Sequence, residues 1–416
     1  MKTATFAGII LTAALCIAPA CRAQRSVILS ERVHTLQVNK NGNWDELPCI
    51  PLDGDDRIVI SFDEMSHNYR RLTYRIRHYR SDWSESDLFE SDYLDGFNDL
   101  PVSDYRNSQN TTFLYTHYTL ELPNDDVRLT ASGNYEVTIT DNSNDEELLK
   151  ARFSVFEPGV HISAEVSGNT DMDTNGHNQQ MSLTVNYGSL PVNDPEREII
   201  VQATQNRRTD MMRDRLKPAH ITPGQMSFTH NRDLIFPGGN EYRRFEIVNM
   251  YDNNQNVDKI DFFDPYFHAT LIQDSPRREY LFDMDHNGRY LIRYDQAADS
   301  DIEADYLLVH FTLKTPECTG GDIYLDGDFA DGKPDSRWRM EYDRAEGRYE
   351  KTAVLKMGAY NYRYLFVPYG SATGETARME GDSFETENDY QIYVWFRQNG
   401  SRYDRLVGVA ETGSRE

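Results

Sequence analysis

The feature that most constrains this chain is a two-residue alternation of apolar and polar side chains, repeated in short stretches along most of its length. Residues 72–79 show it most cleanly, because Leu72, Tyr74, Ile76 and His78 fall on one face. This period is typical of half-buried β-strands, and no apolar stripe at helical spacing extends beyond two turns. The pattern therefore predicts an all-β fold. The 26 tyrosines agree with it, because Tyr suits half-buried strands.

The strand-like segments fall into three series. Glu157-Pro158-Gly159 ends the first series, because Pro and Gly interrupt regular structure, and the acidic stretch 295–303 separates the second from the third. Strands at this spacing, with turn residues between them, are typical of β-sandwiches. We expect serial domains of the fibronectin III or immunoglobulin-like kind: an N-terminal sandwich over 24–157, a middle sandwich over 158–298 and a C-terminal sandwich over 299–416.

The first 23 residues indicate export. Lys2 precedes a short apolar run, and small residues follow as far as Ala23, as in a secretory signal too short to span a membrane. Two processing outcomes stay open. Cleavage after Ala23 leaves a chain that begins at Gln24, whereas Cys21 could instead carry a lipid. The Leu that usually stands three residues before a lipidated Cys is missing, which favours the first outcome.

The chain is strongly acidic. Without residues 1–23, its 43 basic residues fall to 41 against 68 acidic ones, so the formal net charge becomes −27. Such a surface disfavours nucleic acid and anionic lipid as partners, and suits either simple solubility or a basic protein partner. Cys49 and Cys318 would remain, and because they lie in different expected domains we expect two free thiols.

Two stretches begin like a calcium-binding loop, D-x-D-x-N-G, in which carboxylate and amide oxygens can surround Ca²⁺. The full loop needs Glu at its twelfth position, where this chain has Ser182 and Tyr294. Both stretches lie between expected strands, where Asp, Asn and Gly are common turn residues. We therefore expect turns and no metal site. The candidate ligands are Asp171, Asp173 and Asn175 in one stretch and Asp283, Asp285 and Asn287 in the other.

No motif points to catalysis. The sequence has no nucleophile elbow, phosphate-binding loop or dinucleotide fingerprint, and its histidines are scattered without the spacing of a metal site. A glycosidase-type carboxylate pair cannot be recognised among 68 acidic residues, so a secreted hydrolase stays an alternative. We expect no enzyme activity, no cofactor and no small-molecule substrate.

An ordered set of short stretches resembles the plug protein of the bacterial type IX secretion system. It begins with Tyr93-Leu94-Asp95-Gly96-Phe97 and ends with Tyr403-Asp404, and so spans nearly the whole chain after the signal. The stretches between them are 104–112, 115–118, 122–124, 132–135, 205–207, 238–243, 285–288, 305–306, 327–329, 356–360 and 385–390. The resemblance implies a periplasmic protein that binds the outer-membrane translocon β-barrel at its periplasmic mouth and seals it while no cargo is present.

The last expected domain also resembles early-set immunoglobulin-like modules, which include glycogen-binding domains, through Gly327-Asp328-Phe329. Those modules usually place a sugar-stacking Trp soon after this turn, whereas here Trp338 comes much later. The resemblance supports a sandwich fold and leaves sugar binding in doubt. A surface or periplasmic glycan-binding lipoprotein is therefore the alternative function.

A plug that is monomeric by itself needs a contact surface, and aromatic side chains are enriched at the centres of such surfaces. Residues 93–118 are the candidate, because they are rich in Tyr, Asn and Ser and are long for a simple connection. The competing interpretation is a sandwich loop with Tyr105 or Tyr115 in the core. The candidate contact residues are Tyr93, Phe97, Tyr105, Tyr115 and Tyr118.

Overall fold

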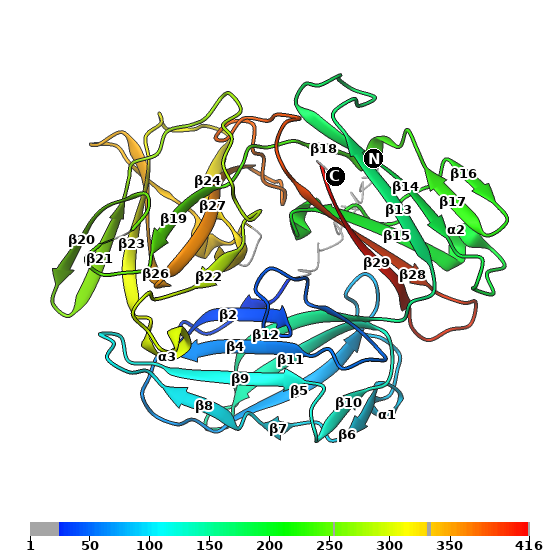
Figure 1. Ribbon diagram of the computed structural model, residues 1–416, viewed down its shortest axis with the longest axis horizontal. Coiled ribbons are helices and arrows are strands. Elements are labelled where there is room, and N and C mark those ends of the chain that lie inside the picture. The colour runs from blue at the N-terminus through cyan, green and yellow to red at the C-terminus, as the bar shows by residue number, and fades with distance from the viewer. Residues whose placement is uncertain (1–24, 253, 331–333, 415–416) are drawn as a thin grey trace, which may run out of the picture.

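The computed structural model describes residues 25–252, 254–330 and 334–414, which form three β-sandwich lobes around a common junction (Figure 1). The expected signal peptide, with Cys21, lies outside the described residues. Helices α1 (Glu90–Tyr93), α2 (Pro195–Glu198) and α3 (Ser300–Glu303) are single turns in connections between strands. The prediction of an all-β sandwich fold is confirmed.

The N-terminal lobe, residues 25–157, packs two sheets around one core. One sheet has the order β1-β12-β11-β5-β7 with β3 beside β12, the other has the order β2-β4-β9-β8, and β6 pairs with β10. In β5 the alternation is as predicted, since Leu72, Tyr74, Ile76 and His78 are all buried. The strands are β1 Val27–Ile28, β2 Val33–Lys40, β3 Cys49–Pro51, β4 Ile58–Glu64, β5 Leu72–Tyr79, β6 Leu94–Gly96, β7 Leu100–Pro101, β8 Asp104–Asn107, β9 Thr116–Leu122, β10 Val127–Leu129, β11 Gly133–Asp141 and β12 Glu146–Phe156.

The middle lobe comprises residues 158–242 and 381–414. One sheet has the order β13-β14-β17-β16 with β18 beside β14, and the other has the order β15-β28-β29. Val185 and Val201 share their core with Ile392 from the end of the chain. The strands are β13 His161–Ser167, β14 Asn178–Asn186, β15 Ile199–Gln205, β16 His220–Thr222, β17 Gln225–Phe228, β18 Ile235–Pro237, β28 Asp389–Phe396 and β29 Arg405–Gly413.

The inserted lobe, residues 243–380, lies between β18 and β28 in the chain. One sheet has the order β20-β21-β23-β26-β25, and in the other β27 pairs with β19, β22 and β24. Phe245 and Leu307 belong to its core. The strands are β19 Arg243–Ile247, β20 Val257–Phe263, β21 Tyr266–Leu271, β22 Tyr290–Ile292, β23 Tyr306–Leu313, β24 Gly321–Asp326, β25 Glu341–Asp343, β26 Arg348–Lys356 and β27 Gly358–Pro368.

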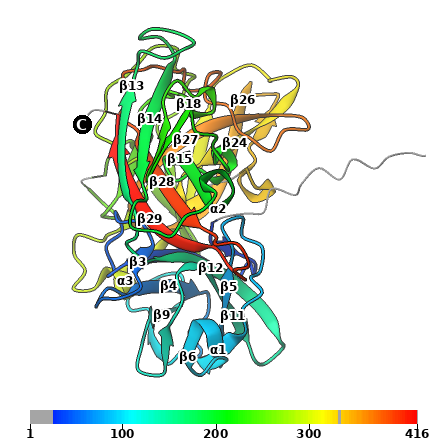
Figure 2. The same cartoon turned by 90° about the vertical axis from the view of Figure 1, so that its right-hand side faces the viewer.

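The strand pairing does not follow the expected boundaries 158–298 and 299–416. Strands β28 and β29, expected in a C-terminal domain, complete the middle lobe through the pairing of β28 with β15, and Figure 2 shows them beside β13 and β15. Strands β19 to β22, expected in the middle domain, pack with β23 to β27 instead. The physical reason is that alternation marks a buried face but does not say which sheet covers it.

Candidate functional site at the junction of the lobes

The segment predicted to contact a partner lies largely against the inserted lobe. The backbone N–H groups of Thr112 and Phe113 donate to the Asp305 carboxylate at 2.7 and 3.1 Å. The Phe113 ring stacks on Tyr266 with 3.9 Å between ring centroids. Arg106 pairs with Asp299 in the connection before β23. Part of residues 104–118 therefore forms an internal interface with the inserted lobe.

A buried charge cluster stands at the centre of that interface. Asp63 on β4 accepts hydrogen bonds from the Lys356 ammonium on β26 at 2.6 Å and from the Tyr306 hydroxyl on β23 at 2.6 Å. His117 Nδ1 lies 2.7 Å from the other Asp63 oxygen. Burial opposes ionisation of Asp63, but the Lys356 charge and the hydrogen bond with His117 outweigh burial and hold the Asp63 pKa below its ordinary value. The cluster thus joins two lobes through an ion pair in which both side chains are buried.

Tyr115 completes this contact. Its ring lies under the Lys356 ammonium, 4.2 Å from nitrogen to centroid, and its hydroxyl donates to the Ala304 carbonyl at 2.8 Å. A cation over an aromatic face is stabilised further when both are desolvated, as they are here. Burial, with Asp63 and Asp305 nearby, raises the pKa of Tyr115, so the phenol stays neutral and keeps its donor proton.

The structure separates the five predicted contact residues into two groups. Tyr93, Tyr115 and Tyr118 are 7 %, 0 % and 0 % exposed: Tyr93 and Tyr118 belong to the core of the N-terminal lobe, and Tyr115 is buried between two lobes. Phe97 and Tyr105 are 73 % and 41 % exposed and stay candidates for contact with a partner. Tyr105 packs on Tyr69 with 4.6 Å between centroids, whereas Phe97 follows the short strand β6, so the structure does not unite the five in one patch.

Single arginines reach across all three lobes. Arg289 of the inserted lobe pairs with Asp45 of the N-terminal lobe and with Asp389 of the middle lobe, each at 3.0 Å. Arg25 of the N-terminal lobe pairs with Asp328 of the inserted lobe at 2.9 Å and donates to the Arg207 carbonyl of the middle lobe at 2.9 Å. Each of these side chains is held by groups from two other lobes.

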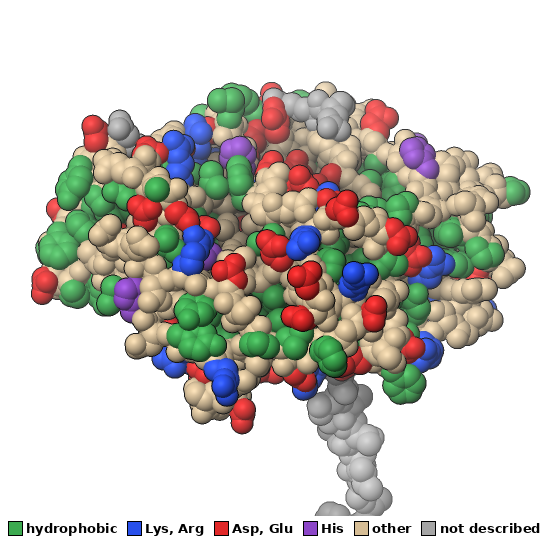
Figure 3. Space-filling model, turned by 60° about the horizontal axis from the view of Figure 1, so that its bottom comes forward, with side chains coloured by type: hydrophobic (Ala, Val, Ile, Leu, Met, Phe, Trp, Pro, Cys, Tyr) green, Lys and Arg blue, Asp and Glu red, His purple; other side chains and the backbone are tan. Residues whose placement is uncertain are grey.

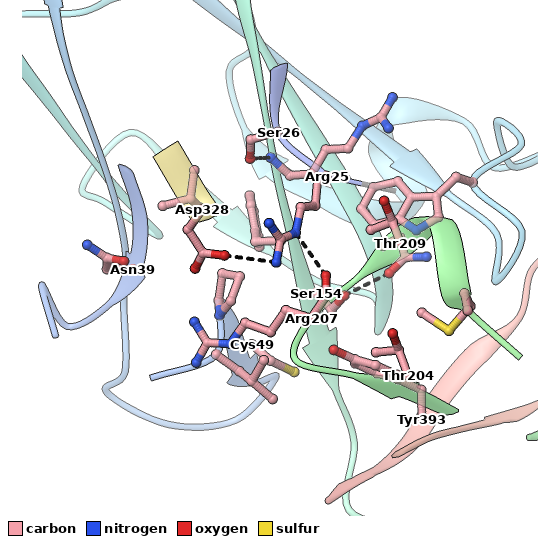
Figure 4. A pocket seen from close by; sticks show the side chains of 18 of the residues that line it. Arg25, Ser26, Asn39, Cys49, Ser154, Thr204, Arg207, Thr209, Asp328 and Tyr393 are labelled. Atoms are coloured by element: carbon pink, nitrogen blue, oxygen red, sulfur yellow. Dashed lines mark hydrogen bonds and ion pairs between the residues drawn. The ribbon is translucent and has the colours of Figure 1, made fainter. Parts of the chain in front are cut away.

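Arg25 also lines a cavity of about 190 Å³ where the lobes meet, and Figure 4 shows it between Asp328 and the Arg207 backbone. Burial, with Arg289 and Arg25 nearby, lowers the pKa of Arg207, and its buried Nε has no hydrogen-bond partner among the described residues. The charged part of the cavity wall consists of Arg25, Arg152 and Arg207 with one carboxylate, Asp328, which is paired with Arg25. Burial raises the pKa of the Cys49 thiol in its wall to about 12, which leaves that thiol a poor nucleophile.

The calcium-loop candidates act as turn residues. The Asp173 carboxylate accepts from the Thr170 hydroxyl and the His177 N–H, and Asp171 accepts from Gln180. Asn175 has a φ of 49°, which suits a turn. Across the described residues, no group of three or more His, Cys, Asp or Glu side chains could hold a metal ion.

The second stretch is used in the same way. Asp283 pairs with Arg244 at 3.0 Å, and the Asp285 carboxylate accepts from the backbone N–H groups of Tyr242 and Asn287. Burial raises the pKa of Asp285 to about 6. Asp285 thus fastens its turn to the residue that precedes β19.

In the part of the chain that the structure describes, no helix is long and apolar enough to cross a membrane.

The N-terminal lobe matches a known family. Residues 33–157 fit the model of the first domain of the type 9 secretion system plug protein. Residues 33–157 thus form a first domain of the type IX secretion plug family. This match agrees with the resemblance seen in the sequence and associates the chain with type IX secretion.

The solved structures include a relative that matches nearly the full length of this chain. A hypothetical protein from Parabacteroides merdae is 41 % identical, with 94 % of this chain and 99 % of that chain covered and a TM-score of 0.92. The C-terminal domain of the Streptococcus pyogenes antigen I/II-family protein AspA is 9 % identical over 91 % of this chain and 99 % of that chain, with a TM-score of 0.16, too low to carry an argument. No curated protein matches the chain.

Sequence reasoning missed the junction itself. Asp63 is the second-last residue of a strand that begins with Ile58-Val59-Ile60, and Lys356 follows the apolar run Ala353-Val354-Leu355. A charge near the end of an apolar strand is a weak signal, because most such charges turn towards water. The sequence signal that could have suggested the ion pair is the opposite sign of two such charges, Asp63 and Lys356, on strands far apart in sequence.

Proposed function

We propose that this protein is the plug that binds the periplasmic mouth of the outer-membrane type IX translocon and seals it while no cargo occupies the pore. It would reside in the periplasm, attached peripherally to the outer membrane through the translocon barrel, and would be monomeric by itself. The family match associates the chain with this secretion system. The role of a stopper accounts for a chain built around contacts between lobes rather than around a reactive group.

The observation that carries the proposal is the fastening of three lobes into one body. Lys356 with Asp63, Arg289 with Asp45 and Asp389, and Arg25 with Asp328 each cross a lobe boundary. Removing one partner of a buried ion pair leaves the other charge uncompensated at a cost of about 3–5 kcal/mol, so the buried Lys356–Asp63 pair favours the one arrangement of the lobes in which both charges meet. A body of fixed shape can close an opening without ordering itself on binding, and so without that entropic cost.

The experiment is a capture from native membranes in mild detergent, with the tagged full-length chain as bait. We expect a large outer-membrane β-barrel to be recovered at near-stoichiometric yield. Deletion of the plug should also admit large antibiotics that the outer membrane normally excludes, and re-expression should restore the barrier. Recovery of no outer-membrane barrel, together with an unchanged barrier in the deletion strain, would show that the proposal is wrong.

The glycan-binding alternative has one supporting observation. A cavity of about 620 Å³ between β2 and β26 is lined by Trp338 and Phe329, whose rings lie 5.3 Å apart. Aromatic rings on a cavity wall can stack on sugars, but Phe329 also packs on Tyr360 inside the lobe. Retention of the protein on polysaccharide columns, lost in Trp338→Ala, would favour this alternative over the plug.

A further inference from the structure

The β20–β21 hairpin carries a concentration of exposed aromatic side chains. Phe262 and Phe263 are 53 % and 61 % exposed at its tip. The Phe262 ring contacts that of Phe267, its pairing partner on β21, with centroids 4.9 Å apart, and the Phe263 ring contacts that of His268, which pairs with Asp261, at 5.2 Å. Hydrophobic side chains gather over this hairpin at the left edge of the molecule in Figure 3. An exposed concentration of this kind marks an interaction site more often than a lone exposed ring does.

The patch continues onto the N-terminal lobe. Tyr266 at the start of β21 stacks on Phe113, and the next residue, Leu114, is 52 % exposed. We call this set the aromatic hairpin surface: Phe113, Leu114, Phe262, Phe263, Tyr266 and Phe267. The surface is thus continuous with the buried interface at Asp63 and Tyr115, and its two parts, one from the N-terminal lobe and one from the inserted lobe, meet only when these lobes are docked.

The backbone that carries this surface is also held in one conformation. The backbone on both sides of the Thr112–Phe113 peptide is held by the Asp305 carboxylate, and Tyr266 follows a two-residue turn that joins paired strands. Side chains that are ordered before binding lose less conformational entropy when a partner arrives. Large aromatic groups in this state are the usual energetic centres of protein interfaces.

The charges around the surface indicate the chemistry of the partner. The hairpin carries Asp258, Asp261 and Asp264 against a single Lys259, and Lys259 is paired with Asp261 at 2.7 Å. Asp258 and Asp264 are exposed. An apolar knob with an acidic rim is complementary to an apolar pocket bordered by Lys or Arg, and is repelled by an anionic lipid surface.

We propose that the aromatic hairpin surface seats this protein on its translocon, with Phe262 and Phe263 entering an apolar pocket of the barrel's periplasmic rim that is bordered by basic residues. The inference rests on the proposed function and specifies the contact that the proposed function requires. The sequence predicts a contact anywhere in residues 93–118. The proposed contact is narrower: it uses only Phe113 and Leu114 of that segment, together with the β20–β21 hairpin of the inserted lobe.

The test compares capture of the barrel from native membranes by the wild-type chain and by the double variant Phe262→Ser/Phe263→Ser. We expect the double variant to recover at least about tenfold less barrel, because loss of central aromatic anchors typically costs more than 1.4 kcal/mol. Tyr369→Ser is the matched control, because Tyr369 is an equally exposed ring, at 71 %, on the same lobe. Capture by Tyr369→Ser should equal that of the wild type.

Asp258→Lys tests the acidic rim. We expect severalfold weaker capture and a weaker dependence of capture on salt, because attraction between opposite charges is replaced by repulsion. Unchanged capture by Asp258→Lys would show that basic residues do not border the pocket.

Thermal melting checks the fold of each variant. If the double variant melts at a lower temperature than the wild type, capture by the single variant Phe263→Ser decides the test, because the one ring contact of the Phe263 side chain among the described residues is with His268.

The outcomes separate the two proposals. If the wild-type chain recovers no barrel, the proposed function fails. If the wild-type chain and the folded hairpin variants recover it equally, the plug stands and the aromatic hairpin surface is not its seat. If the wild-type chain sediments with phosphatidylethanolamine vesicles and the double variant does not, the surface binds lipid and the inference is wrong.

Discussion

At the scale of single residues, His78 shows how burial fixes a charge state. Its Nε2–H donates to the Ser132 carbonyl at 3.0 Å, and its Nδ1 accepts from the Ser86 hydroxyl at 2.9 Å, so the neutral ring satisfies both nitrogens. Burial lowers its pKa from 6.5 to about 4. Between these values the unfolded chain binds the proton and the folded chain does not, so the free energy of unfolding falls as the pH falls.

We expect this one group to remove about 2 kcal/mol of stability between pH 7 and pH 5. Urea unfolding of the wild-type chain and of His78→Gln at both values measures it, since Gln can bond both neighbours but cannot titrate. The variant should be less stable at pH 7 and lose less on acidification. Equal losses in the two proteins would show that His78 titrates normally in the folded state.

At the scale of elements, strand β28 stabilises the middle lobe, whose second sheet it completes by pairing with β15. Ile392 is fully buried against β14 and β15, so Ile392→Ala should cost about 2–5 kcal/mol through lost burial and a residual cavity. Hydrogen exchange should rise in β14 and β15, far earlier in sequence, and stay unchanged in β23 and β26. The matched control Val309→Ala, in the inserted-lobe core, should show the reverse. Faster exchange confined to β23 to β27 in Ile392→Ala would contradict this assignment.

The same strand marks how far sequence alone reaches. The sequence predicts strands at 72–79 and 390–397, and both are present, as β5 (Leu72–Tyr79) and β28 (Asp389–Phe396). The location of β28 could not be predicted, because the entropic cost of closing a long loop rises only slowly with its length and a lobe can be inserted at little expense. The contact residues fared similarly: Tyr fits a core and an interface equally well, so the pattern could not separate Tyr105 from Tyr118.

At the scale of the whole molecule, the question is what keeps three lobes in one shape. Of the ion pairs that cross a lobe boundary, Asp63–Lys356 should influence the docking of the lobes most, because both of its side chains are buried while the lobes are docked. Lys356→Met keeps the length of the side chain but leaves the Asp63 charge buried and poorly compensated, at a cost of about 3–5 kcal/mol. That cost is relieved when the N-terminal and inserted lobes separate, so we expect opening of the junction before unfolding of either lobe.

Small-angle X-ray scattering should therefore give a larger radius of gyration for Lys356→Met than for the wild-type chain, with the β-sheet circular dichroism unchanged. Arg106→Ala, which removes a half-exposed ion pair from the same junction, should scatter like the wild type, because surface pairs contribute about 0–1 kcal/mol. Asp63→Asn added to Lys356→Met should restore much of the compact shape, since the uncompensated charge is then gone. If Lys356→Met scatters like Arg106→Ala, hydrophobic contact rather than the buried pair holds the lobes together, and a plug could keep its shape without this lock.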